Sequence, residues 1–81
     1  MELTYPVIVS KFNDNGNYFV VTSPALTELK VTKRTMPDAT FWAADEIATM
    51  LEGKEDYPAP GDPASWDLKN NDQVLYLTIE I

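Results

Sequence analysis

The chain has its clearest structural pattern in residues 4–26, TYPVIVSKFNDNGNYFVVTSPAL. Two runs rich in β-branched and aromatic residues, 5–12 and 17–23, flank the tetrapeptide Asn13-Asp14-Asn15-Gly16. Asn and Asp tolerate left-handed backbone conformations, and Gly adopts them without steric cost, so this tetrapeptide is typical of a turn between antiparallel strands. The segment therefore predicts a β-hairpin.

The two predicted hairpin strands differ in their hydrophobic pattern. The first alternates, and its buried face is expected to carry Leu3, Tyr5, Val7 and Val9. The second strand is apolar on both faces, with Tyr18 and Val20 on one and Phe19 and Val21 on the other. Such a strand is typical of the centre of a sheet. A third strand is expected at 29–33, where lysines suit an exposed edge.

Residues after the third strand predict one amphipathic helix. Thr35 and Asp38 have the spacing of a capping box, Pro37 suits the first helical turn, and Gly53 is a natural stop. One helical stripe collects the residues expected to face the core: Met36, Ala39, Thr40, Ala43, Ile47, Met50 and Leu51.

A fourth strand is expected at 73–81, where apolar residues alternate. The order β-β-β-α-β predicts a single α+β domain, residues 1–81, with one helix packed on one face of an antiparallel-type sheet. No second helix covers the other face, so we expect that face to associate with further copies in a homodimer or higher homo-oligomer. Its expected residues are Ile8, Phe19, Val21, Val74 and Tyr76.

Two large aromatic side chains fall off the core stripe of the helix. Phe41 lies on the far side with Asp45, and Trp42 lies on a flank. Either the Pro-rich segment 57–66 covers them through Tyr57 and Trp66, or they contact a partner protein.

Composition narrows the classes of function. The 81 residues include 13 acidic and 6 basic side chains, a net charge of −7, so direct binding of nucleic acid is not expected and a basic protein is a better partner. The chain has no Cys and no His, so it lacks the usual nucleophile–base pairs. No run approaches a membrane span and no signal-peptide pattern precedes residue 5, so we expect a cytoplasmic protein.

The carboxylates are the one plentiful reactive group. A divalent-metal site for phosphodiester hydrolysis would need several of them together, and the set to consider is Asp14, Asp45, Glu52, Glu55 and Asp56. Their positions in a turn, on the outer helix face and in a loop favour solvated surface charge instead. No catalytic, metal-binding or cofactor-binding residue is therefore expected, and the chain is not expected to be an enzyme.

The run YPVIVSKFNDNGNYFVVTSP, then Thr35, Ala39 and Ala43, then DEIATMLEG, resembles the HicB-type antitoxins of bacterial and phage toxin–antitoxin pairs. Residues 26–29, LTEL, stand where the family often has Pro-Gly, and Pro37 and Glu46 replace its usual Glu and Ala. The resemblance implies a partial RNase H-like fold without a working nuclease site. Most members add a C-terminal DNA-binding module, which this chain is expected to lack.

The resemblance also implies a function: binding a small basic HicA-type mRNA endoribonuclease toxin and covering its RNA-binding and catalytic face. The candidate contact residues are Phe41, Trp42 and Asp45 on the outer helix, with Asp14 and Asn15 at the hairpin. The alternative is an orphan, possibly phage-derived, oligomeric domain of the same fold with no toxin partner.

Overall fold

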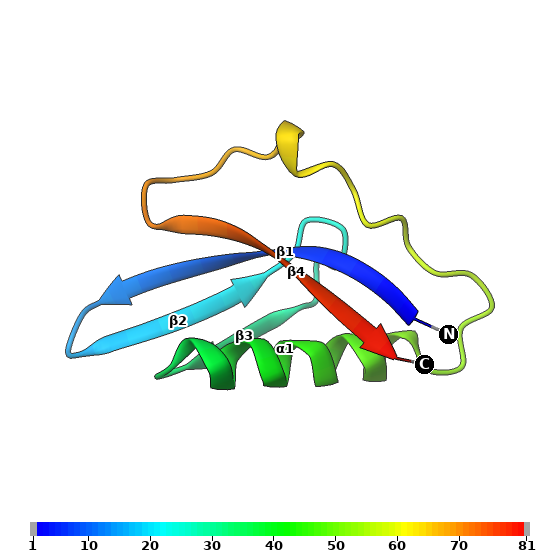
Figure 1. The fold of residues 1–81 in the computed structure, drawn as a ribbon, viewed down its shortest axis with the longest axis horizontal. Helices are drawn as coiled ribbons and strands as arrows, with labels where there is room; N and C mark the ends of the chain where they lie inside the picture. Colours follow the sequence, from blue (N-terminus) through cyan, green and yellow to red (C-terminus); the bar gives the residue numbers. More distant parts are fainter. Residues whose placement is uncertain (1, 81) are drawn as a thin grey trace.

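The computed structural model describes residues 2–80, which form a four-stranded antiparallel sheet with one long helix along one side (Figure 1). The elements are β1 (Glu2–Asn13), β2 (Asn17–Thr22), β3 (Lys30–Lys33), α1 (Met36–Leu51), a short 3-10 turn η1 (Pro63–Ser65) and β4 (Asp72–Glu80). The sheet order is β3-β2-β1-β4. The predicted α+β class and element order are confirmed, and the last residue of the predicted fourth strand, Ile81, lies outside the described residues.

The first hairpin is closed by a loop of three residues. Asn13 pairs with Asn17, and Asn15 (φ 60°) and Gly16 (φ 103°) both have positive φ between them. Left-handed residues of this kind close a three-residue hairpin loop without splaying the strands. The resulting register sets Val9 opposite Val21, so these two side chains lie on the same face of the sheet.

This register corrects the predicted face of β2. Val21 is fully buried in the core on the helix side, and Phe19 packs against that core, so neither belongs to the face opposite the helix. The error arises from the loop: a four-residue turn would shift the pairing by one residue, and such a shift exchanges the two faces of a strand. Tyr18 and Val20 occupy the opposite face in their place, together with Ile8, Val74 and Tyr76.

The helix begins at Met36, so Pro37 lies in its first turn, as the sequence predicts. The Thr35 side chain accepts a hydrogen bond from the Asp38 amide (3.3 Å), as the capping pattern predicts, and Asp38 lies in the first turn. At the other end the helix stops at Leu51, and Gly53 follows with φ 78°. A glycine tolerates that conformation because it has no Cβ.

The core lies between α1 and the inner face of the sheet. The buried apolar side chains that form this core are Tyr5, Val7, Val9, Val21, Leu26, Leu29, Val31, Ala39, Ala43, Ile47, Leu51 and Ile79. Four positions of the predicted helix stripe are fully buried, and two of them are alanines, which let the helix approach the strands closely. Leu26 and Leu29 reach the core from the β2–β3 connection. There the Ser23 hydroxyl accepts a hydrogen bond from the Leu26 amide (3.3 Å).

Pro6 lies inside the central strand without a lost hydrogen bond. The Lys11 amide donates to the Asn71 carbonyl (3.0 Å), so position 11 faces β4, and strict alternation then turns the backbone of Pro6 toward β2. The β1–β2 ladder ends at the Ile8–Thr22 pair. The missing N–H of Pro6 therefore points beyond the end of that ladder.

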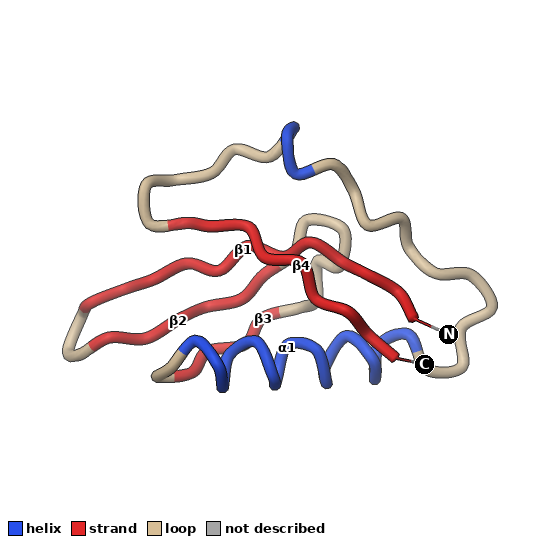
Figure 2. Tube along the Cα trace, viewed as in Figure 1, coloured by secondary structure: helices blue, strands red, loops and turns tan. Residues whose placement is uncertain are grey.

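A long connection, residues 52–71, leads from α1 to β4 and crosses the side of the molecule away from the helix (Figure 2). The buried ring of Tyr5 anchors it, because the Tyr5 hydroxyl donates to the Pro58 carbonyl (2.8 Å). Burial, with a smaller effect from Tyr57, raises the pKa of Tyr5, so this hydroxyl stays protonated and remains a donor at neutral pH. The connection also packs closely at Gly61, where an added methyl group would be in van der Waals contact with Trp66 (3.6 Å) and Ala25 (3.9 Å).

Replacing Tyr5 with Phe is expected to loosen this connection while leaving the core filled. Loss of one hydrogen bond costs roughly 0.5–1.5 kcal/mol. Amide hydrogen exchange should therefore accelerate in residues 54–62 more than in α1. Tyr76→Phe, which removes a hydroxyl from a ring that is 64% exposed, is the matched control. Equal protection of the connection in the two variants would contradict the anchoring role of Tyr5.

The start of β4 is held by a carboxylate, which predicts an acid-dependent loss of stability. Asp72 accepts hydrogen bonds from the Ser10 hydroxyl and the Lys69 amide, and these bonds, the first being the larger cause, hold the pKa of Asp72 below its ordinary 3.8. A lowered folded-state pKa contributes stability above the ordinary value, and this stability is lost as pH falls through the folded-state pKa.

Urea unfolding measured between about pH 6 and pH 2 tests this expectation. In Ser10→Ala the pKa of Asp72 should move back toward 3.8, and the acid-dependent part of the free energy of unfolding should shrink. An unchanged pH profile in that variant would show that the Ser10 hydroxyl does not stabilise the ionised carboxylate.

Candidate functional site

The outer side of α1 presents an uncovered aromatic pair. Phe41 is 67% exposed and Trp42 is 46% exposed, and their rings meet edge to face with centroids 5.6 Å apart. Tyr57 packs against the core instead of over these rings. The connection 52–71 therefore leaves both aromatics open to solvent, and the covering-loop alternative is wrong for this pair.

The same helix is acidic on its exposed side. Asp38, Asp45 and Glu46 are exposed, and no Lys or Arg occurs between Met36 and Leu51. Asp45 follows Phe41 by four residues, so the two lie on one side of the helix. The structure thus places three of the five predicted contact residues, Phe41, Trp42 and Asp45, on one exposed surface, which we call the helix surface.

Negative charge also gathers where the helix does not favour it. Glu52 occupies the C-cap position, the last turn has no basic residue, and Glu55 and Asp56 follow at once. The C-terminal end of a helix carries partial negative charge, so carboxylates there oppose the helix dipole. Lys54 is the one cation in this stretch. These carboxylates lower the stability of the helix in the free protein, and their charge is complementary to a basic surface.

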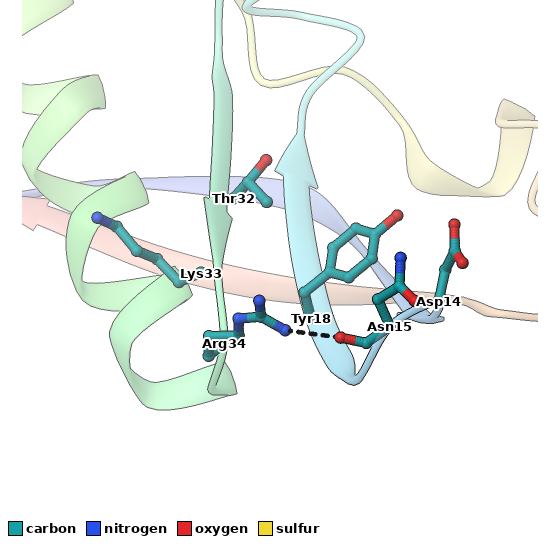
Figure 3. Close-up of a pocket in the computed structure, with 6 residues that line it drawn as sticks. All are labelled: Asp14, Asn15, Tyr18, Thr32, Lys33 and Arg34. Carbon is teal, nitrogen blue, oxygen red and sulfur yellow. Dashed lines mark hydrogen bonds between the residues drawn. The ribbon is translucent and has the colours of Figure 1, made fainter.

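The two hairpin residues of the predicted contact set lie in a separate hollow. Asp14 and Asn15 line it with Tyr18, Thr32, Lys33 and Arg34 (Figure 3). The Arg34 guanidinium donates to the Asn15 carbonyl (3.4 Å), which ties the hairpin tip to the chain just before α1. Asp14 and Asn15 are exposed at this tip.

Lys33 connects the hairpin hollow with the helix surface. Its ammonium nitrogen lies 5.0 Å from the centre of the Trp42 ring, a cation–π contact, so its side chain points toward α1 (Figure 3). Residue 33 also lines the hairpin hollow. A second shallow hollow, lined by Lys30, Val31, Thr32, Lys33, Trp42 and Glu46, shares Thr32 and Lys33 with the first. Asp14, Asn15 and Trp42 are the predicted contact residues that line these two hollows, which together form a strip across β3.

Sequence reasoning missed Lys33, Thr32 and Tyr18 as members of this strip. The cluster of Lys30, Lys33 and Arg34 is visible in the sequence, but its proximity to Trp42 depends on how β3 packs against α1. Tyr18 could have been assigned only with the correct hairpin register.

The predicted self-association face is partly present. Ile8 and Val74 are half-buried and Tyr76 is exposed on the side of the sheet away from α1, where Phe12 and Tyr18 also stack with centroids 5.2 Å apart. Phe19 and Val21 do not contribute to it, for the reason given above. The face is thus aromatic at one end and contains the exposed Tyr76 ring on β4.

The acidic side chains do not form a metal centre in the described structure. Within residues 2–80, no three or more Asp and Glu side chains are grouped so that they could hold a metal ion. The set Asp14, Asp45, Glu52, Glu55 and Asp56 is accordingly spread over the hairpin, the helix and the following loop. The geometry gives no support to the metal-nuclease alternative.

Comparison with known proteins adds no identification, since no family model matches the chain and no curated protein sequence is significantly similar to it. The resemblance to HicB-type antitoxins stays a prediction. No helix within residues 2–80 combines the length and the apolar character needed to cross a membrane.

Neutralising the carboxylate at the end of α1 is expected to stabilise the protein. Glu52→Gln removes a charge that opposes the helix dipole, and the free energy of unfolding should rise by roughly 0.3–1 kcal/mol at low salt. Asp38→Asn is the matched control at the other end of the same helix, where the charge is favourable, and it should lower stability. Urea unfolding at low and high salt measures both, and changes of the same sign would contradict the dipole argument.

Proposed function

We propose that this protein is a non-catalytic binding module whose helix surface docks on a small basic protein. The observation that carries the proposal is the exposed Phe41–Trp42 pair on a helix that has acidic but no basic side chains. Exposed aromatic side chains are the commonest anchors of protein interfaces, and a rim of one charge selects a partner of the opposite charge.

The partner that we propose is a HicA-type mRNA endoribonuclease. The sequence resemblance supports this identity, and the net charge of −7 supports it independently, because a ribonuclease must present Lys and Arg to RNA phosphates. Asp45 beside the aromatic anchors and Glu52 at the end of α1 would take the place of those phosphates. Inhibition would then be steric and electrostatic, without a chemical step.

The strip across β3 limits how the partner sits. Lys30 and Lys33 line one hollow with Trp42, so positive charge meets the helix surface at this margin. A uniformly basic partner would be repelled there. We therefore place the basic face of the toxin over the acidic side and the C-terminal end of α1, near Asp45 and Glu52, and we propose a cytoplasmic location because mRNA is the toxin's substrate.

An orphan oligomeric domain is the second candidate. The observation that favours it is the partly open sheet face with Ile8, Val74 and Tyr76, which lies away from the helix surface. Binding of a toxin and association between copies would use different surfaces, so the two candidates can be tested separately.

The proposal predicts that truncating either ring of the aromatic pair weakens inhibition of a HicA-type toxin. Each anchor removed from the centre of an interface typically costs about 2 kcal/mol or more, so Phe41→Ala and Trp42→Ala should each weaken binding by roughly 30-fold. Binding of a purified, catalytically inactive HicA-type toxin is measured by calorimetry, and inhibition of the active form is measured by RNA cleavage.

Tyr76→Ala is the matched control, since it truncates an aromatic ring of similar exposure on another face. It should bind and inhibit as the parent does. Two results would overturn the proposal: no binding of the toxin by the parent protein, or full inhibition by folded Phe41→Ala and Trp42→Ala variants. The association rate of the parent should also fall as salt rises.

A further inference from the structure

The outer edge of β4 presents unpaired backbone groups. The Lys11 amide donates a hydrogen bond to the Asn71 carbonyl, so the odd-numbered residues of β4 make the backbone hydrogen bonds to β1. Val74, Tyr76 and Thr78 therefore direct their N–H and C=O groups away from β1. Within residues 2–80, the backbone of positions 73–80 makes no hydrogen bond to a segment other than β1. Tyr76 and Thr78 are exposed.

The two edges of the sheet are protected to different degrees. β3 is four residues long and has a lysine at each end, and short lysine-bearing edges resist pairing with other chains. β4 is nine residues long and contains no Lys, Pro or Gly. Its charged residues, Asp72 and Glu80, lie only at the two ends, so the long uncharged stretch between them is a template for one more strand.

We infer that β4 pairs antiparallel with β4 of a second copy of this chain, which joins two four-stranded sheets into one. Identical strands that pair antiparallel are related by a two-fold axis, so a single contact closes the dimer. Tyr76 opposite Thr78 of the other copy is the register that fits, because Val74 then faces Glu80 and the carboxylates of Asp72 and Glu80 are not set against each other. A register centred on Tyr76 would instead set Asp72 against Glu80, and like charges directly opposite are unfavourable.

Properties of the single chain favour a second copy as the occupant. An 81-residue chain buries a thin core, so association adds stability that the monomer cannot supply alone. The exposed Tyr76 ring on the face away from α1 gains a neighbour from the other copy. This pairing leaves the helix surface free, so the inference does not depend on the proposed function and extends beyond it.

Cross-linking through single cysteines tests the pairing, because the natural chain has no cysteine. Residues opposite each other at a hydrogen-bonded position lie about 5.5 Å apart at Cα, which a disulfide can span. Tyr76→Cys and Thr78→Cys chains carrying different tags, mixed and mildly oxidised, should form a mixed disulfide. Phe41→Cys mixed with Thr78→Cys is the control and should not.

Thr78→Pro tests the backbone contacts directly. The N–H removed points away from β1, and proline is tolerated on sheet edges, so the fold should persist while the dimer is lost. Sedimentation velocity should show a dimer for the parent and a monomer for Thr78→Pro. Tyr76→Lys adds a positive charge to the edge of the sheet and should also weaken the dimer. It replaces Thr78→Pro as the test if the proline variant does not fold.

Two outcomes would overturn the inference. One is a parent protein that stays monomeric at the highest concentration measured. The other is a dimer that survives both Thr78→Pro and Tyr76→Lys and gives no mixed disulfide, which would assign the contact to the sheet face or the helix surface instead.

Discussion

The three-residue loop between β1 and β2 is the constraint on which the other placements depend. With Asn15 and Gly16 in positive φ, Asn13 pairs with Asn17 and Val9 meets Val21. β1 is the central strand, bonded to β2 on one side and β4 on the other, so its orientation decides which face of each neighbour meets α1. A loop one residue longer would turn Val21 and Phe19 outward and remove them from a core that has few large side chains.

Much of this arrangement can be predicted from the sequence, and there is a physical reason why the rest cannot. The helix stripe could be predicted because a period of 3.6 and the Thr35 cap act within a few residues. The faces of β2 could not, because both are apolar and only the exact loop length distinguishes them. The strip that joins Trp42 to Lys33 depends on packing between β3 and α1, which no local pattern encodes. The candidate residues on one helix were therefore brought together correctly, while their neighbours on the sheet were missed.

Some residues at the ends of α1 stabilise the helix and others destabilise it, and the destabilising ones are concentrated at its C-terminal end. The cap at Thr35 and the acidic residue in the first turn both favour the helix. At the far end Glu52, Glu55 and Asp56 work against it. Natural sequences tend to break local rules where a surface has a task besides folding. The acidic end and the open aromatic pair therefore have a common explanation if both meet a basic partner.

The pairing of Glu2 with Glu80 sets both described ends of the chain side by side on adjacent strands (Figure 1). Directly opposed residues of an antiparallel pair lie about 4.5–5.5 Å apart at Cα, so a linker of very few residues could join them. The topology is thus nearly a closed circle, and new ends could be opened within the exposed residues 59–62 without cutting a strand or the helix. Such a rearranged chain would hold Glu2 and Glu80 opposite each other beside the new linker, whereas the ends of the natural strands are free to separate.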